Sequence, residues 1–172
     1  TNTIFSSVRY GNVIASRGSF VPLFMDWIKK DQKIKVTSGE MTRFLFTLDD
    51  AVDAVLGALE NSQGGEVFVP QINSYTLPVC IKALEKIINK KSNTEIVGLR
   101  PGEKLHEDML AETELPFTYQ VPNINLLQIR PQYTTKLYKN WEKYTGPHFN
   151  SELWVKENVD ELVKLIKKGI KC

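Results

Sequence analysis

Apolar residues recur at helical spacing in two stretches of the first half of the chain. From Phe20 to Ile28 they fall at i, i+4, i+7 and i+8, which is the spacing of one helix face, so we expect a helix packed on a sheet. A second stripe follows Asp49 and Asp50, either of which can cap a helix, and Gly64-Gly65 ends the pattern. The members of this second stripe are Val52, Val55, Leu56 and Leu59.

Two further helices are predicted downstream. Thr76 can cap the first of them, and Pro78 suits its first turn. Its expected buried stripe consists of Cys80, Ala83, Leu84, Ile87 and Ile88. The last helix is expected to open at Asn150 or Ser151 and to end at Gly169. Its shared face consists of Val155, Val159, Leu162, Val163 and Ile166.

Short β-rich segments alternate with these helices. They are residues 4–13, 34–37, 43–47, 66–70 and 94–99, followed by two extended pieces within 119–130. Alternating strands and helices indicate an α/β fold. The final third is too irregular to complete a doubly wound sheet by itself.

Composition and charge restrict the function classes. The 172 residues are 42% hydrophobic and 24% charged, the profile of one ordinary globular domain. A formal net charge of +2 is too small for nonspecific electrostatic binding to nucleic acid or an anionic membrane, so neither is an expected partner. Without a spanning apolar run or a signal-peptide layout at the first residues, a cytoplasmic location is expected. Cys80 is predicted to be a buried thiol and Cys172 a frayed end, not a disulfide framework.

Several catalytic and cofactor motifs are missing from the sequence. It has no glycine-rich phosphate loop of the Rossmann or P-loop type, and no G-x-S-x-G nucleophile turn. His106 and His148 are far apart in the chain and lack metal-ligand spacing. We therefore expect no metal site and no catalytic residue in this chain.

Arginines in turns or at element edges are the remaining candidates for chemistry. Arg17, Arg43 and Arg100 each occupy such a position, where a guanidinium can meet an anion such as a diphosphate. The alternative is that all are ordinary surface arginines. Asn12 can equally be a turn residue, and Glu103 can cap a short helix expected after residues 100–104.

Ordered sequence blocks between Val8 and Leu110 resemble a known family. The blocks are VRYGNVIASRGSFVPLF, EMTRFLFTLDDAVDAVLGALE, GGEVFVPQINSYTL and IVGLRPGEKLHEDML. They closely resemble the second half of UDP-N-acetylglucosamine 4,6-dehydratases, which are extended short-chain dehydrogenases/reductases of surface-glycan biosynthesis. The block GGEVFVPQI together with RPGEKLHE looks most like the inverting branch that starts the pseudaminic acid pathway, while the retaining and epimerase-like branches share several of the same segments. Beyond Leu110 the match is looser.

This resemblance implies a fold and a place for the chain within it. Residues 1–172 would form a single C-terminal substrate-binding half, a small mixed α/β domain. Residues 4–13 and 66–70 would be the last strands of an incomplete Rossmann sheet. An N-terminal Rossmann half of about 150 residues would be missing. That half would bind NADP and supply the Tyr-x-x-x-Lys pair, which no tyrosine of this chain forms. The complete enzyme would be a homo-oligomer.

The resemblance also assigns residues to a UDP-sugar substrate. Arg43 and Arg100 would clamp the diphosphate, and Glu103 would accept hydrogen bonds from the ribose hydroxyls. Asn12 would touch the sugar or the diphosphate.

Other assignments concern the two ends of the site. Ser19 and Phe20 would face the uridine, and Thr37 would line the uracil. Tyr10 and Gly11 would lie near the nicotinamide end of the cofactor.

The implied reaction is that of a lyase, and two alternatives stay open. Hydride passes from sugar C4 to NADP, water is lost across C5 and C6, and the hydride returns to C6. This chain alone would be inactive and would orient the substrate. One alternative is a UDP-sugar 4-epimerase or reductase of the same superfamily, and the other is a non-catalytic binding module. A severed half should expose a large apolar patch and an unpaired strand edge.

Overall fold

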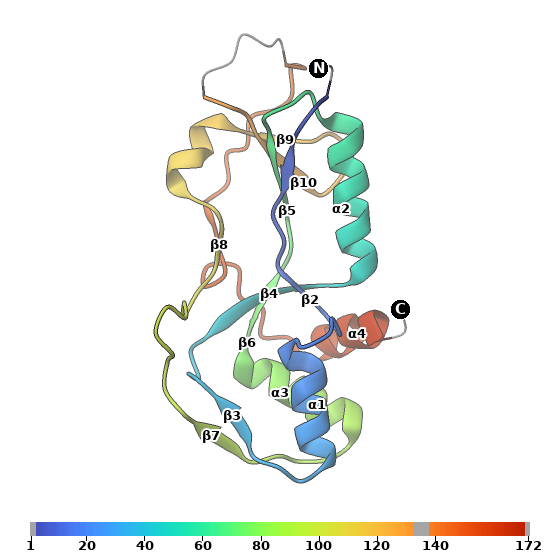
Figure 1. Cartoon of the computed structure of the whole chain (residues 1–172), viewed down its shortest axis with the longest axis vertical. Helices are drawn as coiled ribbons and strands as arrows, with labels where there is room; N and C mark the ends of the chain where they lie inside the picture. The colour runs from blue at the N-terminus through green and yellow to red at the C-terminus, as the bar shows by residue number, and fades with distance from the viewer. Residues whose placement is uncertain (1–2, 133–137, 171–172) are drawn as a thin grey trace. The chain divides into compact units, whose positions relative to one another are not determined.

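The computed structural model describes residues 3–132 and 138–170 of a mixed α/β fold (Figure 1). The chain divides into two compact units. The first unit comprises residues 1–10, 49–71 and 108–150, and the second comprises residues 11–48, 72–107 and 151–172. The predicted single substrate-binding half stays a prediction. Cys172 lies outside the described residues.

A four-stranded sheet forms the centre of the first unit. Its strands, in spatial order, are β1 (Ser7–Val8), β5 (Val67–Pro70), β10 (Leu126–Ile129) and β9 (Thr118–Gln120). β1 runs parallel to β5, whereas β10 is antiparallel to β5 and β9. The segments predicted as strands at 4–13 and 66–70 therefore pair in one sheet. The first is shorter than expected, because β2 (Asn12–Val13) belongs to a different sheet.

Helix α2 (Leu48–Asn61) packs on this sheet through its small residues. Ala54 and Ala58 join Phe68 and Leu126 in one buried cluster. A Cβ at Gly57 would lie 2.9 Å from Ile124 Cδ1, so a larger residue there would displace the end of the Ile124 side chain. The stripe of larger apolar residues faces away from that cluster and is exposed, with Leu59 at 73%.

An ion pair connects β1 to the irregular part of the first unit. That part contains β8 (Asp108–Leu110), the 3₁₀ helix η1 (Glu112–Phe117) and β11 (Phe149–Asn150). Arg9 donates to both carboxylate oxygens of Glu114 at 2.7 and 2.8 Å and to Met109 O at 2.8 Å. The short helix expected directly after residues 100–104 is wrong, because β8 intervenes before η1.

Three helices and two small sheets form the second unit (Figure 1). The helices are α1 (Phe20–Lys29), α3 (Leu77–Ile88) and α4 (Val159–Ile170). One sheet has the order β2, β4 (Thr42–Phe46), β6 (Ser74–Thr76), and the other pairs β3 (Ile34–Val36) with β7 (Thr94–Ile96) in parallel. α3 packs against both α1 and α4, and their apolar faces form the buried core of this unit.

Local features of α3 confirm the sequence interpretation. Thr76 Oγ1 caps the helix by accepting a hydrogen bond from Val79 N at 3.4 Å. Cys80 is fully buried, and burial raises the pKa of its thiol to about 12. An inert core thiol at this position is therefore the correct interpretation.

The expected start of the last helix is wrong. α4 begins at Val159, where Asn158 Oδ1 accepts hydrogen bonds from the N–H groups of Asp160 and Glu161 at 3.0 and 3.1 Å. Asn150 instead belongs to β11, and Ser151 is buried. The helix starts after Asn158 and not after Asn150 or Ser151, because the Asn158 side chain accepts hydrogen bonds from the first backbone N–H groups, which have no partner within the helix.

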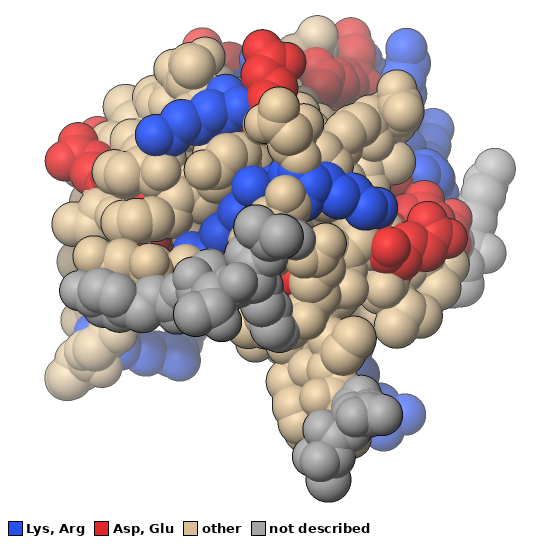
Figure 2. Space-filling view, turned by 90° about the horizontal axis from the view of Figure 1, so that it is seen from above, with Lys and Arg blue, Asp and Glu red and all other residues tan. Residues whose placement is uncertain are grey.

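Charged side chains of both signs share the surface that Figure 2 presents. Lys and Arg side chains of the described residues lie there among Asp, Glu and uncharged residues (Figure 2). Among the described residues, no helix is long and apolar enough to cross a bilayer.

Candidate functional site

The loop Arg100-Pro-Gly-Glu103 forms a tight turn in the second unit. Glu103 N donates to Arg100 O at 3.0 Å, and Gly102 has φ +80°. Proline second and a positive-φ glycine third are the features of a type II turn. Glu103 Oε2 also accepts from Arg100 N at 3.2 Å, so the turn fixes the two residues side by side.

The Arg100 guanidinium is exposed at this turn. It makes no hydrogen bond or ion pair with any other residue in the part of the chain that the structure describes. Thr37 Oγ1 lies 3.5 Å from Glu103 Oε1, which brings the end of β3 to the turn. Three predicted site residues, Thr37, Arg100 and Glu103, are therefore together. The alternative role of Glu103 as a helix cap is wrong, because the residues that follow are not helical.

Arg43 on β4 is turned toward the same loop. Its Nη2 donates to Lys104 O at 3.0 Å, and its Nη1 donates to Leu105 O at 3.1 Å and Thr42 O at 2.8 Å. Only 13% of its side chain is exposed. Arg43 thus holds the loop in place, and a diphosphate contact by this residue stays a prediction.

Glu107 joins two of the predicted residues. The Asn12 side-chain amide lies 3.3 and 3.2 Å from its two carboxylate oxygens, and Arg43 Nε lies 3.6 Å from Oε1. Phe44 N donates to Oε2 at 3.2 Å. Sequence reasoning missed Glu107 as a site residue. The available signal was its position in the RPGEKLHE segment, which it ends.

A buried polar network fixes the chain on either side of Glu107. Thr42 Oγ1 lies 2.8 Å from His106 Nδ1 and 2.6 Å from Ser151 Oγ. Ser151 Oγ accepts from Glu107 N at 2.7 Å, and Ser151 N donates to Glu107 O at 2.8 Å. Both backbone groups of Glu107 are thus satisfied by one buried serine. Sequence reasoning missed this network too, because its members come from distant segments.

Ser19 and Phe20 lie at the start of α1. Ser19 is the N-cap residue, yet its side chain makes no capping hydrogen bond, and its Oγ is buried without a partner among the described atoms. The Phe20 ring packs edge-on against Phe24, with centroids 5.4 Å apart. A buried hydroxyl without a partner is costly, so it marks a place where a ligand could supply the missing hydrogen bond.

Tyr10 and Gly11, predicted near the cofactor, make contacts within the chain. Tyr10 OH donates to Ala51 O at 3.2 Å in the first unit. A Cβ at Gly11 would lie 2.8 Å from both Ile72 Cδ1 and Phe44 Cβ in the second unit. Packing against β4 therefore requires glycine there, and the cofactor roles stay predictions.

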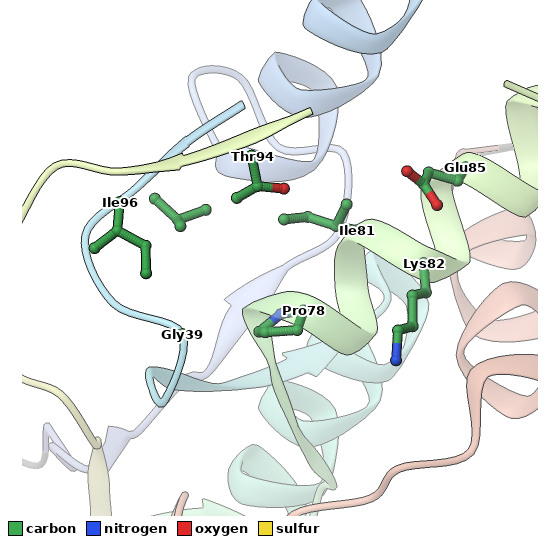
Figure 3. A pocket seen from close by; sticks show the side chains of 8 residues that line it. Gly39, Pro78, Ile81, Lys82, Glu85, Thr94 and Ile96 are labelled. Atoms are coloured by element: carbon green, nitrogen blue, oxygen red, sulfur yellow. The ribbon is translucent and has the colours of Figure 1, made fainter. Parts of the chain in front are cut away.

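A groove of about 420 Å³ lies elsewhere in the second unit (Figure 3). α3 contributes Ile81, Lys82 and Glu85, and β7 contributes Thr94 and Ile96. None of the predicted site residues lines this groove.

Residues 1–128 match the family described as "Polysaccharide biosynthesis protein". The chain belongs to this family. A UDP-glucose 4-epimerase of Rickettsia bellii is 43% identical over 113 residues, which cover 66% of this chain and 33% of that protein. The corresponding Rickettsia felis epimerase is 42% identical over the same length. The chain thus spans about a third of the length of these curated relatives.

Solved structures share the fold. Pen from Bacillus thuringiensis superimposes with a TM-score of 0.83 at 32% identity, over 96% of this chain and 50% of that one. A point mutant of UDP-glucuronic acid 4-epimerase from Bacillus cereus, in complex with UDP-4-deoxy-4-fluoro-glucuronic acid and NAD, gives a TM-score of 0.52 at 23% identity. It covers 58% of this chain and 34% of that one. The mixed α/β fold is that of a partial region of extended short-chain dehydrogenase/reductase structures.

Proposed function

We propose that this chain is the UDP-sugar-binding portion of a nucleotide-sugar enzyme of polysaccharide biosynthesis. The observation that carries the proposal is the type II turn at residues 100–103, which carries both the exposed Arg100 guanidinium and the Glu103 carboxylate. Arg100 can meet a diphosphate, and Glu103 can accept from both hydroxyls of a ribose. Thr37, whose Oγ1 lies 3.5 Å from Glu103 Oε1, would line the uracil.

The contribution of this chain would be orientation. Binding energy from the remote nucleotide can hold the hexose in the geometry that hydride transfer requires. The unpartnered Ser19 hydroxyl supports a uridine contact at the start of α1, and Asn12 would reach the sugar or diphosphate. Catalytic groups would come from outside residues 1–172.

Two reactions are compatible with the proposal. The motif RPGEKLHE favours a UDP-N-acetylglucosamine 4,6-dehydratase, and the 42–43% identical relatives favour a UDP-sugar 4-epimerase. Both begin with removal of hydride from C4 by a nicotinamide cofactor, which we propose is NADP. Tyr10 and Gly11 would lie near its nicotinamide end.

The first unit supports a missing partner half. β1 is the edge strand of its sheet within the described chain, and Phe5 beside it is 76% exposed. The exposed apolar face of α2 belongs to the same unit. An N-terminal Rossmann half would cover such a surface, and the complete enzyme would form a homo-oligomer. An exposed face of this kind equally suits a non-catalytic binding module, and a monodisperse monomer in solution would count against the missing half.

Nuclear magnetic resonance of the labelled chain tests the proposal. Titration with UDP should shift the backbone amides of Thr37, Arg100 and Glu103, and ADP should shift them less at equal concentration. Equal shifts with both nucleotides, or shifts confined to the groove beside α3, would contradict it.

The product distinguishes the two reactions. A polypeptide containing this chain and the first half of the fold is incubated with UDP-N-acetylglucosamine and NADP, and the nucleotide sugar is analysed by mass spectrometry and by proton magnetic resonance, which distinguishes 4-epimers of equal mass. A dehydratase yields a product lighter by one water, whereas an epimerase yields an isomer of unchanged mass.

A further inference from the structure

The Glu107 carboxylate accepts hydrogen bonds from Asn12 and Phe44 and forms an ion pair with Arg43, and these partners lie on two strands. The Asn12 amide comes from β2, and Arg43 Nε and Phe44 N come from β4. A carboxylate is acceptor-only, so it can face all of these donors at once. An amide of the same shape would turn its own N–H₂ toward at least one of them.

The backbone of Glu107 is held as firmly as its side chain. Ser151 accepts from Glu107 N and donates to Glu107 O, and Ser151 is fully buried. The backbone that carries this carboxylate is therefore fixed by two hydrogen bonds, whereas the Arg100 side chain on the neighbouring turn is exposed.

We propose that Glu107 is a positioning residue of the UDP-sugar site, which holds Asn12 and Arg43 in the orientation that meets the diphosphate. This inference rests on the proposed function. Glu107 itself carries a negative charge and would not touch the phosphates; it acts through the donors that it orients. The Nη atoms of Arg43 donate to the carbonyl oxygens of Lys104 and Leu105. The Glu107 carboxylate fixes the remaining nitrogen of the guanidinium, Nε.

Glu107→Gln tests the proposal, with Glu95→Gln as a charge-matched control on the exposed part of β7. A first readout needs no ligand: the Arg43 Nε–H and Asn12 side-chain amide signals are recorded by magnetic resonance. In Glu107→Gln the Arg43 signal should shift and exchange faster with solvent, and in Glu95→Gln it should not.

The second readout compares UDP with uridine. Loss of the charge-assisted contacts should weaken UDP binding by about tenfold. Uridine lacks the diphosphate, so its affinity should change by less than about twofold. A merely structural role would weaken both ligands alike. Glu107→Asp keeps the charge and should recover part of the UDP affinity, which also covers the case in which Glu107→Gln fails to fold.

The outcomes separate the two proposals. Absence of UDP binding by the wild-type chain overturns the proposed function and the role of Glu107 with it. Binding by the wild type with unchanged UDP affinity in Glu107→Gln, or an equal loss for uridine, overturns the role of Glu107 alone. Unchanged Arg43 and Asn12 signals overturn it as well.

Discussion

Single residues of the RPGE turn show how a short motif specifies geometry. Proline limits φ at the second position, and Gly102 takes a positive φ that other residues adopt only under strain. The grouping of Arg100 with Glu103 was therefore predictable from sequence. The position of Glu107 was not, because its partners Asn12 and Arg43 approach it only after β2 and β4 pair.

Gly11 provides a prediction at the residue scale. Gly11→Ala places a Cβ 2.8 Å from Ile72 Cδ1 and Phe44 Cβ, so we expect a loss of about 1–3 kcal/mol in the free energy of unfolding. Urea denaturation measures it. Gly39→Ala is the control, since a Cβ there meets no atom within 4 Å, and should change stability by less than about 0.5 kcal/mol. Equal effects of the two substitutions would contradict the packing argument.

At the scale of elements, periodicity located helices better than their ends or faces. α1 and α3 follow their apolar stripes, and Thr76 caps α3 as expected. The predicted start of α4 was wrong. Several residues of the sequence can cap a helix, and only the structure shows that Asn158 accepts hydrogen bonds from the first backbone N–H groups. β6, β8 and β11 were not predicted, since strands of two or three residues have too little pattern to detect.

Helix α2 shows why a stripe does not reveal which face is covered. Its alanine and glycine face packs on the sheet, and its larger apolar face is exposed. The double variant Leu56→Gln, Leu59→Gln should change the free energy of unfolding by less than about 0.5 kcal/mol. Ala54→Leu overpacks the buried face and should cost about 1–3 kcal/mol. Thermal unfolding measures both effects. If the double variant is destabilised more than Ala54→Leu, this orientation of the helix is refuted.

The ion pair between β1 and η1 predicts acid sensitivity. Hydrogen bonds from Arg9 hold the pKa of Glu114 below its ordinary value, although burial opposes the shift. Glu114 therefore stabilises the fold above its unfolded pKa of about 4.3, and this contribution is lost as pH falls through the lower folded pKa. The hydrogen bond to Glu114 raises the pKa of Arg9, which stays charged across this range.

Glu114→Gln should make the free energy of unfolding depend less steeply on pH between about pH 5 and pH 3. Urea unfolding at a series of pH values measures the slope. Glu60→Gln, an exposed change on α2, is the control and should retain the wild-type slope. An unaltered slope in Glu114→Gln would show that other carboxyl groups dominate acid unfolding.

At the scale of the whole molecule, the match to Pen from Bacillus thuringiensis covers 96% of this chain but only 50% of that structure, and the family match ends at residue 128. The family was predictable because the ordered blocks up to Leu110 carry it. The reaction was not, since the residues proposed to recognise UDP would be separate from those that transfer hydride and protons.

Calorimetric titration of the chain with UDP tests the central claim most directly. We predict saturable heat for the wild type and its loss in Arg100→Ala, because the exposed guanidinium at the turn would contact the diphosphate directly. Arg17→Ala, which removes an exposed loop arginine outside this turn, should retain binding. A cooperatively folded wild-type chain that gives no heat with UDP, or an Arg100→Ala variant that binds as well as the wild type, would contradict the account.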